Sequence, residues 1–176
     1  MFNFRMKLAA IAIVLAAAVA PAHAQSTAST TATAGITVIQ PISIVNNKNM
    51  NFGTFVKPSS NTTVTLSNAG VISGLTAVNT SGNAPSQAQF TITGEGGQAI
   101  NITVPGTVAL TGTGGSLTVT LTADSGTTGS AQVATLSGAI GSAGTKVVNV
   151  GGTVPLTATT ASGAYSGTFT VTAAYQ

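Results

Sequence analysis

Most of this chain alternates apolar and polar residues with a period of two, which is typical of β-strands with one buried face. In each run, Val, Ile, Leu or Phe takes one face, while Thr, Ser, Gln or Asn takes the other. The clearest runs are residues 63–67, 89–93, 100–104 and 116–122. The glycine-rich breaks at 94–97 and 111–115 predict hairpins or loops.

These predicted strands recur every 10 to 15 residues, and no helical period lies between them. Such spacing favours an all-β, antiparallel sandwich over a fold that alternates strands with helices. Residues 71–84 and 131–144 do not alternate cleanly, so we expect irregular strands or long connections there.

The last 14 residues have the most regular pattern in the chain. Their odd positions carry Gly163, Tyr165, Phe169, Val171 and Tyr175, whereas their even positions are mostly Thr and Ala. We expect one long final strand, tied into a sheet because its apolar face would otherwise lie exposed at an edge.

A second alternating run precedes Pro41, with Ala32, Ala34, Ile36 and Val38 on one face. Residues 25–35 contain nothing larger than Thr or Gln, so in isolation they should form a flexible tail. Pro41 interrupts the run because it lacks the N–H that a ladder needs, and a further apolar run follows at 42–45. Two strands in line without a turn need not belong to the same sheet, or to the same molecule.

The first 24 residues have the pattern of a secretory signal peptide. Arg5 and Lys7 precede an apolar run over 8–20, and the small residues of 21–24 suit a cleavage that leaves Gln25 first. The run is too short to span a bilayer comfortably. We therefore expect export through the periplasm to the cell surface or the medium.

Charge and composition argue against several classes of function. Without residues 1–24, three Lys, one Glu and one Asp remain, a net charge of +1 (3 − 2), which excludes a nucleic-acid footprint. Cys, His, Arg and Trp are then absent, so we expect no enzyme, no metal, no cofactor and no small-molecule substrate. We interpret Glu95 and Asp124 as solvated loop charges.

Three features together resemble subunits of chaperone–usher fimbriae, and a related cysteine-free family of secreted bacterial domains of unknown function. Tyr175 is the penultimate residue and Gly163 the fourteenth from the end, as in the C-terminal strand that such subunits present to their chaperone. Residues 41–44 followed by 50–54, Met-Asn-Phe-Gly-Thr, are similar to the first strand of the secreted family. Residues 151–172 resemble its closing hairpin.

This resemblance implies a structural subunit of an extracellular fimbria, pilus or surface fibre. The fold would be an immunoglobulin-like sandwich over 40–176 that lacks one strand, with residues 25–39 as a donor strand for the next copy. Ile36 and Val38 would fill large pockets and Ala32 and Ala34 shallow ones. The implied partners are a periplasmic chaperone, an outer-membrane usher and copies of the chain itself, joined head to tail.

One alternative stays open. In this alternative, the chain is a secreted surface- or carbohydrate-binding module that completes its own sandwich with its N-terminal strand. Alternation does not distinguish a strand supplied by the same chain from one supplied by a neighbour.

Overall fold

The computed structural model describes residues 26–78 and 83–176, so the predicted signal peptide, residues 1–24, and the stretch 79–82 lie outside the described residues. The chain divides into two units, residues 1–36 and 37–176, and the second unit carries the described strands. Within the described part there is no helix, and hence none that is long and apolar enough to span a membrane.

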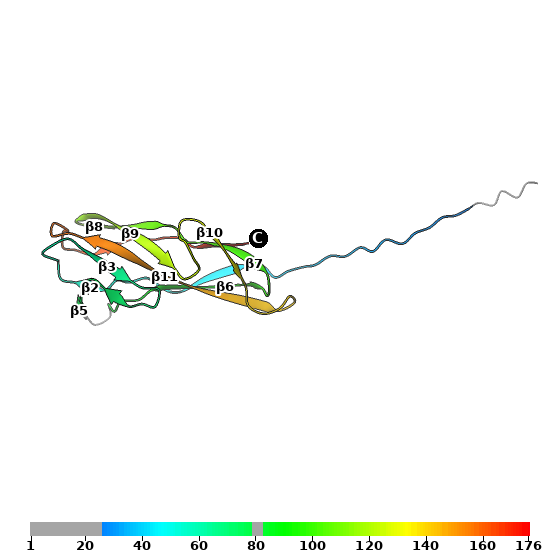
Figure 1. Cartoon of the computed structure of the whole chain (residues 1–176), viewed down its shortest axis with the longest axis horizontal. Coiled ribbons are helices and arrows are strands. Elements are labelled where there is room, and N and C mark those ends of the chain that lie inside the picture. The colour runs from blue at the N-terminus through cyan, green and yellow to red at the C-terminus, as the bar shows by residue number, and fades with distance from the viewer. Residues whose placement is uncertain (1–25, 79–82) are drawn as a thin grey trace, which may run out of the picture. The chain divides into compact units, whose positions relative to one another are not determined.

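All described ladders are antiparallel (Figure 1). The strands are β1 (Ser43–Lys48), β2 (Thr54–Phe55), β3 (Thr62–Leu66), β4 (Ile72–Ser73), β5 (Ala77–Val78), β6 (Ala88–Glu95), β7 (Ala99–Thr103), β8 (Thr107–Gly112), β9 (Gly115–Ala123), β10 (Ala131–Thr135), β11 (Ala143–Leu156), β12 (Tyr165–Ser166) and β13 (Thr172–Tyr175). The prediction of an all-β antiparallel sandwich is confirmed.

The long strand β11 organises the larger sheet, whose order is β1-β6-β11-β9-β8-β12. Strands β6 and β3 follow one another along one edge of β11, and β9 takes the other edge. At this junction a Cβ on Gly152 would lie 2.8 Å from both Thr120 O and the Val119 side chain, so the close approach of β9 requires glycine. The smaller sheet has the order β10-β7-β13, and β2 pairs with β5.

The core contains the apolar faces that the alternation predicts. The inward side chains of β3, β6, β7 and β9 are buried, including Val64, Ile92, Ile100, Ile102 and Val119 at 0% exposure. They pack with Val148, Val150 and Val154 of β11 into one cluster. Among their described residues, the two irregular regions contain the short strands β4 and β5, the edge strand β10 and the first two residues of β11, which agrees with the expected irregular strands and connections.

Two turns behave differently although both are rich in glycine. Residues 113–114 close a true hairpin, because Gly112 pairs with Gly115 and the ladder continues between β8 and β9. Residues 96–98 connect β6 of the larger sheet to β7 of the smaller sheet. The second turn therefore carries the chain from one sheet to the other.

The prediction of a single long C-terminal strand is wrong. The segment forms two short strands, because β12 pairs with β8 of the larger sheet whereas β13 pairs with β7 of the smaller sheet. The expected closing hairpin is also wrong, since β11 is bordered by β3, β6 and β9 in the described residues. The C-terminal chain thus passes from one sheet to the other, and residues 167–171 between its strands belong to no ladder.

Candidate functional site

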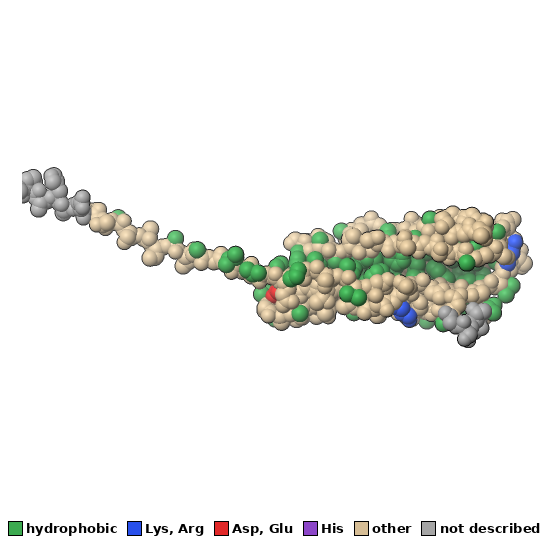
Figure 2. Space-filling view, turned by 180° about the vertical axis from the view of Figure 1, so that it is seen from behind, with side chains coloured by type: hydrophobic (Ala, Val, Ile, Leu, Met, Phe, Trp, Pro, Cys, Tyr) green, Lys and Arg blue, Asp and Glu red, His purple; other side chains and the backbone are tan. Residues whose placement is uncertain are grey.

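The described domain contains an apolar groove of about 950 Å³. Figure 2 shows it as a hollow floored by hydrophobic side chains and bordered by two polar lips. One wall consists of Asn46 and residues 49–58, and the opposite wall is the segment 160–169. The floor is formed by Ala88, Phe90, Val108, Leu110, Leu117, Val154 and Leu156.

The two walls adjoin the two ends of the larger sheet. Strand β1 begins the sheet order and pairs only with β6, and β12 ends it and pairs only with β8, among the described residues. Each therefore has an outer edge without a ladder partner, and such edges are templates for adding a further strand. The groove combines an apolar floor with two open sheet edges, which is the physical requirement for accepting an extended peptide.

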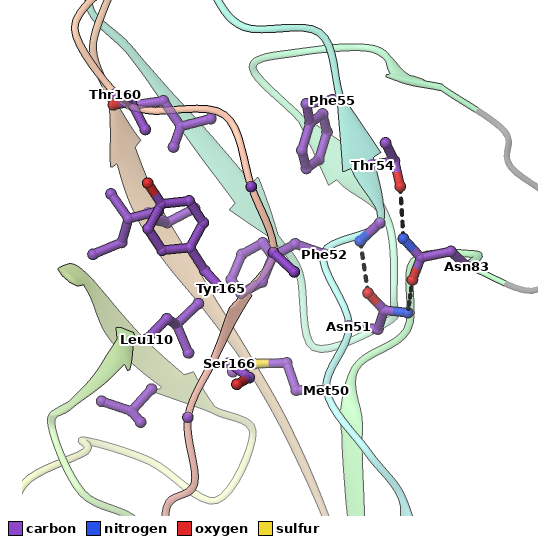
Figure 3. A pocket seen from close by; sticks show the side chains of 18 of the residues that line it. Met50, Asn51, Phe52, Thr54, Phe55, Asn83, Leu110, Thr160, Tyr165 and Ser166 are labelled. Carbon is purple, nitrogen blue, oxygen red and sulfur yellow. Dashed lines mark hydrogen bonds between the residues drawn. The ribbon is translucent and has the colours of Figure 1, made fainter. Parts of the chain in front are cut away.

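Hydrogen bonds shape the wall that contains Asn51, Phe52 and Gly53 (Figure 3). Asn51 Oδ1 accepts a 2.8 Å hydrogen bond from Gly53 N, where φ is +90° and glycine is favoured. Asn51 Nδ2 donates to Asn83 Oδ1 at 2.7 Å, and Asn83 Nδ2 donates to Thr54 Oγ1 at 2.7 Å. This network fixes the turn that holds Phe52 in the groove lining. The Asn-Phe-Gly run thus has a structural role here, which the sequence alone did not indicate.

The groove brings together three of the five C-terminal residues singled out in the sequence. Gly163, Tyr165 and Phe169 line it, and the Phe169 ring meets Phe90 of the floor edge to face, with centroids 6.1 Å apart and an interplanar angle of 70°. Val171 is instead a core residue, 6% exposed. The predicted alternation holds, because the odd side chains Tyr165, Phe169, Val171, Ala173 and Tyr175 are buried or half-buried whereas Thr168, Thr170, Thr172 and Ala174 are exposed.

Tyr175 lies away from the groove lining and takes part in a hydrogen-bonded cluster. Its hydroxyl donates to Gln40 O at 2.7 Å and accepts from Glu95 N at 2.6 Å. The Glu95 carboxylate accepts from Gln40 N at 3.1 Å and from Gly141 N. These contacts join the beginning of the domain to its last strand.

The interpretation of Glu95 as a solvated loop charge is therefore wrong. Its side chain is only 2% exposed, because β6 extends to Glu95 and carries the residue under the loop that contains Gly141. Backbone N–H groups take the place of water around the carboxylate, as burial of a charge requires. Asp124 is exposed as expected and accepts hydrogen bonds from Asn149 N at 2.9 Å and Asn149 Nδ2 at 2.7 Å.

The four predicted donor residues lie outside the described strands. Ala32 and Ala34 are exposed, Ile36 is 90% exposed and Val38 is 83% exposed. Two large aliphatic side chains in nearly full contact with water are costly to leave uncovered, so they are candidates for burial against another surface.

The fold and the groove define an antiparallel β-sandwich with an open apolar channel between two sheet edges. The chain belongs to the family described as "Domain of unknown function (DUF4402)", whose pattern matches residues 42–175. Comparison with curated proteins and with solved structures found no match.

Proposed function

We propose that this protein is a structural subunit of an extracellular fimbria or related surface fibre, assembled by strand donation. The groove of one copy takes up the alternating run of the next copy, residues 28–38, whose Ala32, Ala34, Ile36 and Val38 fill the pockets. The observation that carries the proposal is the apolar groove between two unpartnered sheet edges, on a chain whose N-terminal segment exposes an alternating apolar face.

The dimensions of donor and acceptor agree. Residues 160–169 form a wall of ten residues, which spans at most roughly 33 Å when extended. The alternating run from Ala28 to Val38 contains eleven residues. Its even positions would face the groove floor, while the odd positions, mostly Thr and Ser, would face water.

Burial supplies part of the association free energy. Ile36 and Val38 would each contribute about 1.5–3 kcal/mol on moving from water into the groove, and Ala32 and Ala34 less. Main-chain hydrogen bonds to the two edges add to this term and fix the direction of the donor. Because one copy's donor fills a different copy's groove, the contact is head to tail and generates a filament.

An empty groove is a liability for this chain. Only three Lys, one Glu and one Asp follow residue 24, so charge repulsion gives subunits little protection from aggregation. A periplasmic chaperone that covers the groove, and an outer-membrane usher that releases the subunit to its neighbour, complete the proposal. In this account the protein is exported, is not an enzyme and needs no cofactor.

The test is an unboiled denaturing gel of surface material sheared from cells that express the chain. Strand-donated polymers should appear as a ladder that collapses to monomer on boiling. Deleting residues 25–39 should abolish the ladder, as should Ile36→Asp combined with Val38→Asp.

Thr37→Asp is the matched control for Ile36→Asp alone, because each adds one negative charge and the two positions lie on opposite faces of the donor run. The ladder should persist in this variant. Ladders that survive the deletion, or that disappear equally with Thr37→Asp, would contradict strand donation. A monomer in every sample would favour the self-completed module instead.

A further inference from the structure

The backbone of Gln40 is held on both sides. Its N–H donates to Glu95 Oε2 at 3.1 Å, and its carbonyl accepts from the Tyr175 hydroxyl at 2.7 Å. The same hydroxyl accepts from Glu95 N at 2.6 Å, so the three residues form a closed cluster, which we call the Gln40 clamp. Glu95 is 2% exposed, so the two hydrogen bonds that involve Glu95 are partly shielded from water, whereas the bond from the Tyr175 hydroxyl to Gln40 O is exposed.

The surroundings of the clamp are adapted to it. The second carboxylate oxygen of Glu95 accepts from Gly141 N, so both oxygens have partners. Gly94 lies beneath the Tyr175 ring, where a Cβ would meet the hydroxyl and lie 3.2 Å from Cζ. A larger residue at this position would displace the tyrosine from Gln40.

The clamp sets the direction in which the chain enters the domain. In the ladder between β1 and β6, Ser43 pairs with Thr93 and Lys48 with Gln89. Since Gln40 contacts Glu95, the chain from 40 to 48 follows β6 in one direction without reversing. Asn46 lines the groove, and the path from Asn46 back to Gln40 leads away from it.

We propose that Glu95 and Tyr175 are positioning residues that direct the donor segment toward a second copy and away from its own groove. Ile36 and Val38 precede Gln40 by four and two residues. With Gln40 held in line with β1, a return to the same groove requires a reversal within residues 36–39. That reversal would remove the two largest donor side chains from the strand. The inference rests on the proposed strand donation. It adds a structural reason why the donor segment enters the groove of another copy and not the groove of its own chain.

Crosslinking can measure this selection directly, because the chain contains no cysteine. The parent protein for the test carries Thr37→Cys, on the face of the donor run opposite Ile36 and Val38, and Thr168→Cys, at an exposed position of the groove wall, and is treated with a flexible bismaleimide. Boiled gels separate crosslinks within one molecule from crosslinks between molecules. Glu95→Gln and Tyr175→Phe are then added separately. Asp124→Asn is the matched control, since it makes the same carboxylate-to-amide change at an exposed site outside the groove.

The parent and the Asp124→Asn control should crosslink between molecules. Losing one or two clamp hydrogen bonds should raise the ratio of intramolecular to intermolecular product about tenfold at equal protein concentration. A variant that only loosened the fold would lower both products together and leave their ratio unchanged.

If the parent crosslinks between molecules and neither variant changes the ratio, the clamp inference is wrong while strand donation stands. If the parent crosslinks only within single molecules, or not at all, strand donation fails and the inference fails with it.

Hydrogen exchange of the unmodified protein gives a readout that does not depend on the variants folding. The Gln40 amide should exchange slowly, and exchange as fast as that of Thr37 would overturn the clamp.

Discussion

The double substitution Ile36→Ala with Val38→Ala separates the stability of the fibre from that of the subunit. The two changes remove five methyl or methylene groups, which at about 0.8 kcal/mol each amounts to ~4 kcal/mol of burial when both side chains lie in a groove. In the subunit the same side chains are 90% and 83% exposed, so they contribute almost nothing to its folding. The fibre should therefore weaken roughly a thousandfold per contact, while the unfolding free energy of the monomer stays within about 0.5 kcal/mol.

Two measurements on the mature chain test this difference. The temperature at which the ladder on unboiled gels collapses to monomer reports the contact between copies, and urea unfolding of the monomeric fraction reports the subunit. Thr37→Ala is the matched control, because Thr37 lies between the two residues and points to the opposite face of the donor run. It should leave both measurements unchanged.

The reasoning fails in two distinguishable ways. A monomer destabilised by about 4 kcal/mol would mean that the two side chains are buried within their own domain, and the segment would then complete its own sandwich. No change in either measurement would mean that the segment stays in water, and strand donation would have no basis.

Three further substitutions test the domain itself. Ile102→Ala in β7 should cost about 2–5 kcal/mol in urea unfolding, because its side chain is fully buried, and a loss below 1 kcal/mol would contradict the assigned core. Gly167→Val should destabilise the domain by about 1–3 kcal/mol, because a Cβ at this position would press on the carbonyl of Ala109. Thr168→Val, at the exposed neighbouring position, is the control. Equal losses of stability in the two variants would refute the close approach of Gly167 to Ala109. Asn51→Ala should cost about 1–3 kcal/mol through loss of the bond to Gly53 N, and unchanged melting by circular dichroism would show that the turn does not depend on that bond.

The alternation of apolar and polar residues predicted the strands well where one face of the strand is buried and the other is exposed to solvent. The alternation around Val64, Phe90, Ile102 and Val119 indicated both the strand and the inward residues, because a strand's side chains alternate between its faces whatever its partners are. The same rule identified the inward face of the C-terminal segment, including Tyr165 and its odd neighbours.

Alternation carries no information on pairing partners, and this explains the errors at the C-terminus. The segment from Gly163 to Gln176 has one continuous period, yet β12 joins one sheet and β13 the other. The wall formed by residues 49–58 was likewise missed as part of the groove, because it opposes residues 160–169 only after the sheets have formed. Neither the groove nor its two open edges has a local signature.

By itself, the sequence determined the fold class, the faces of most strands and the exposed apolar run before Pro41, because these depend on side-chain chemistry over a few neighbouring residues. The tertiary structure alone decided that Glu95 is buried, that its carboxylate meets Gln40 and that Tyr175 closes the cluster. Residues 40, 95 and 175 are separated by 55 and 80 positions, and only the stacking of two sheets brings them within hydrogen-bonding distance.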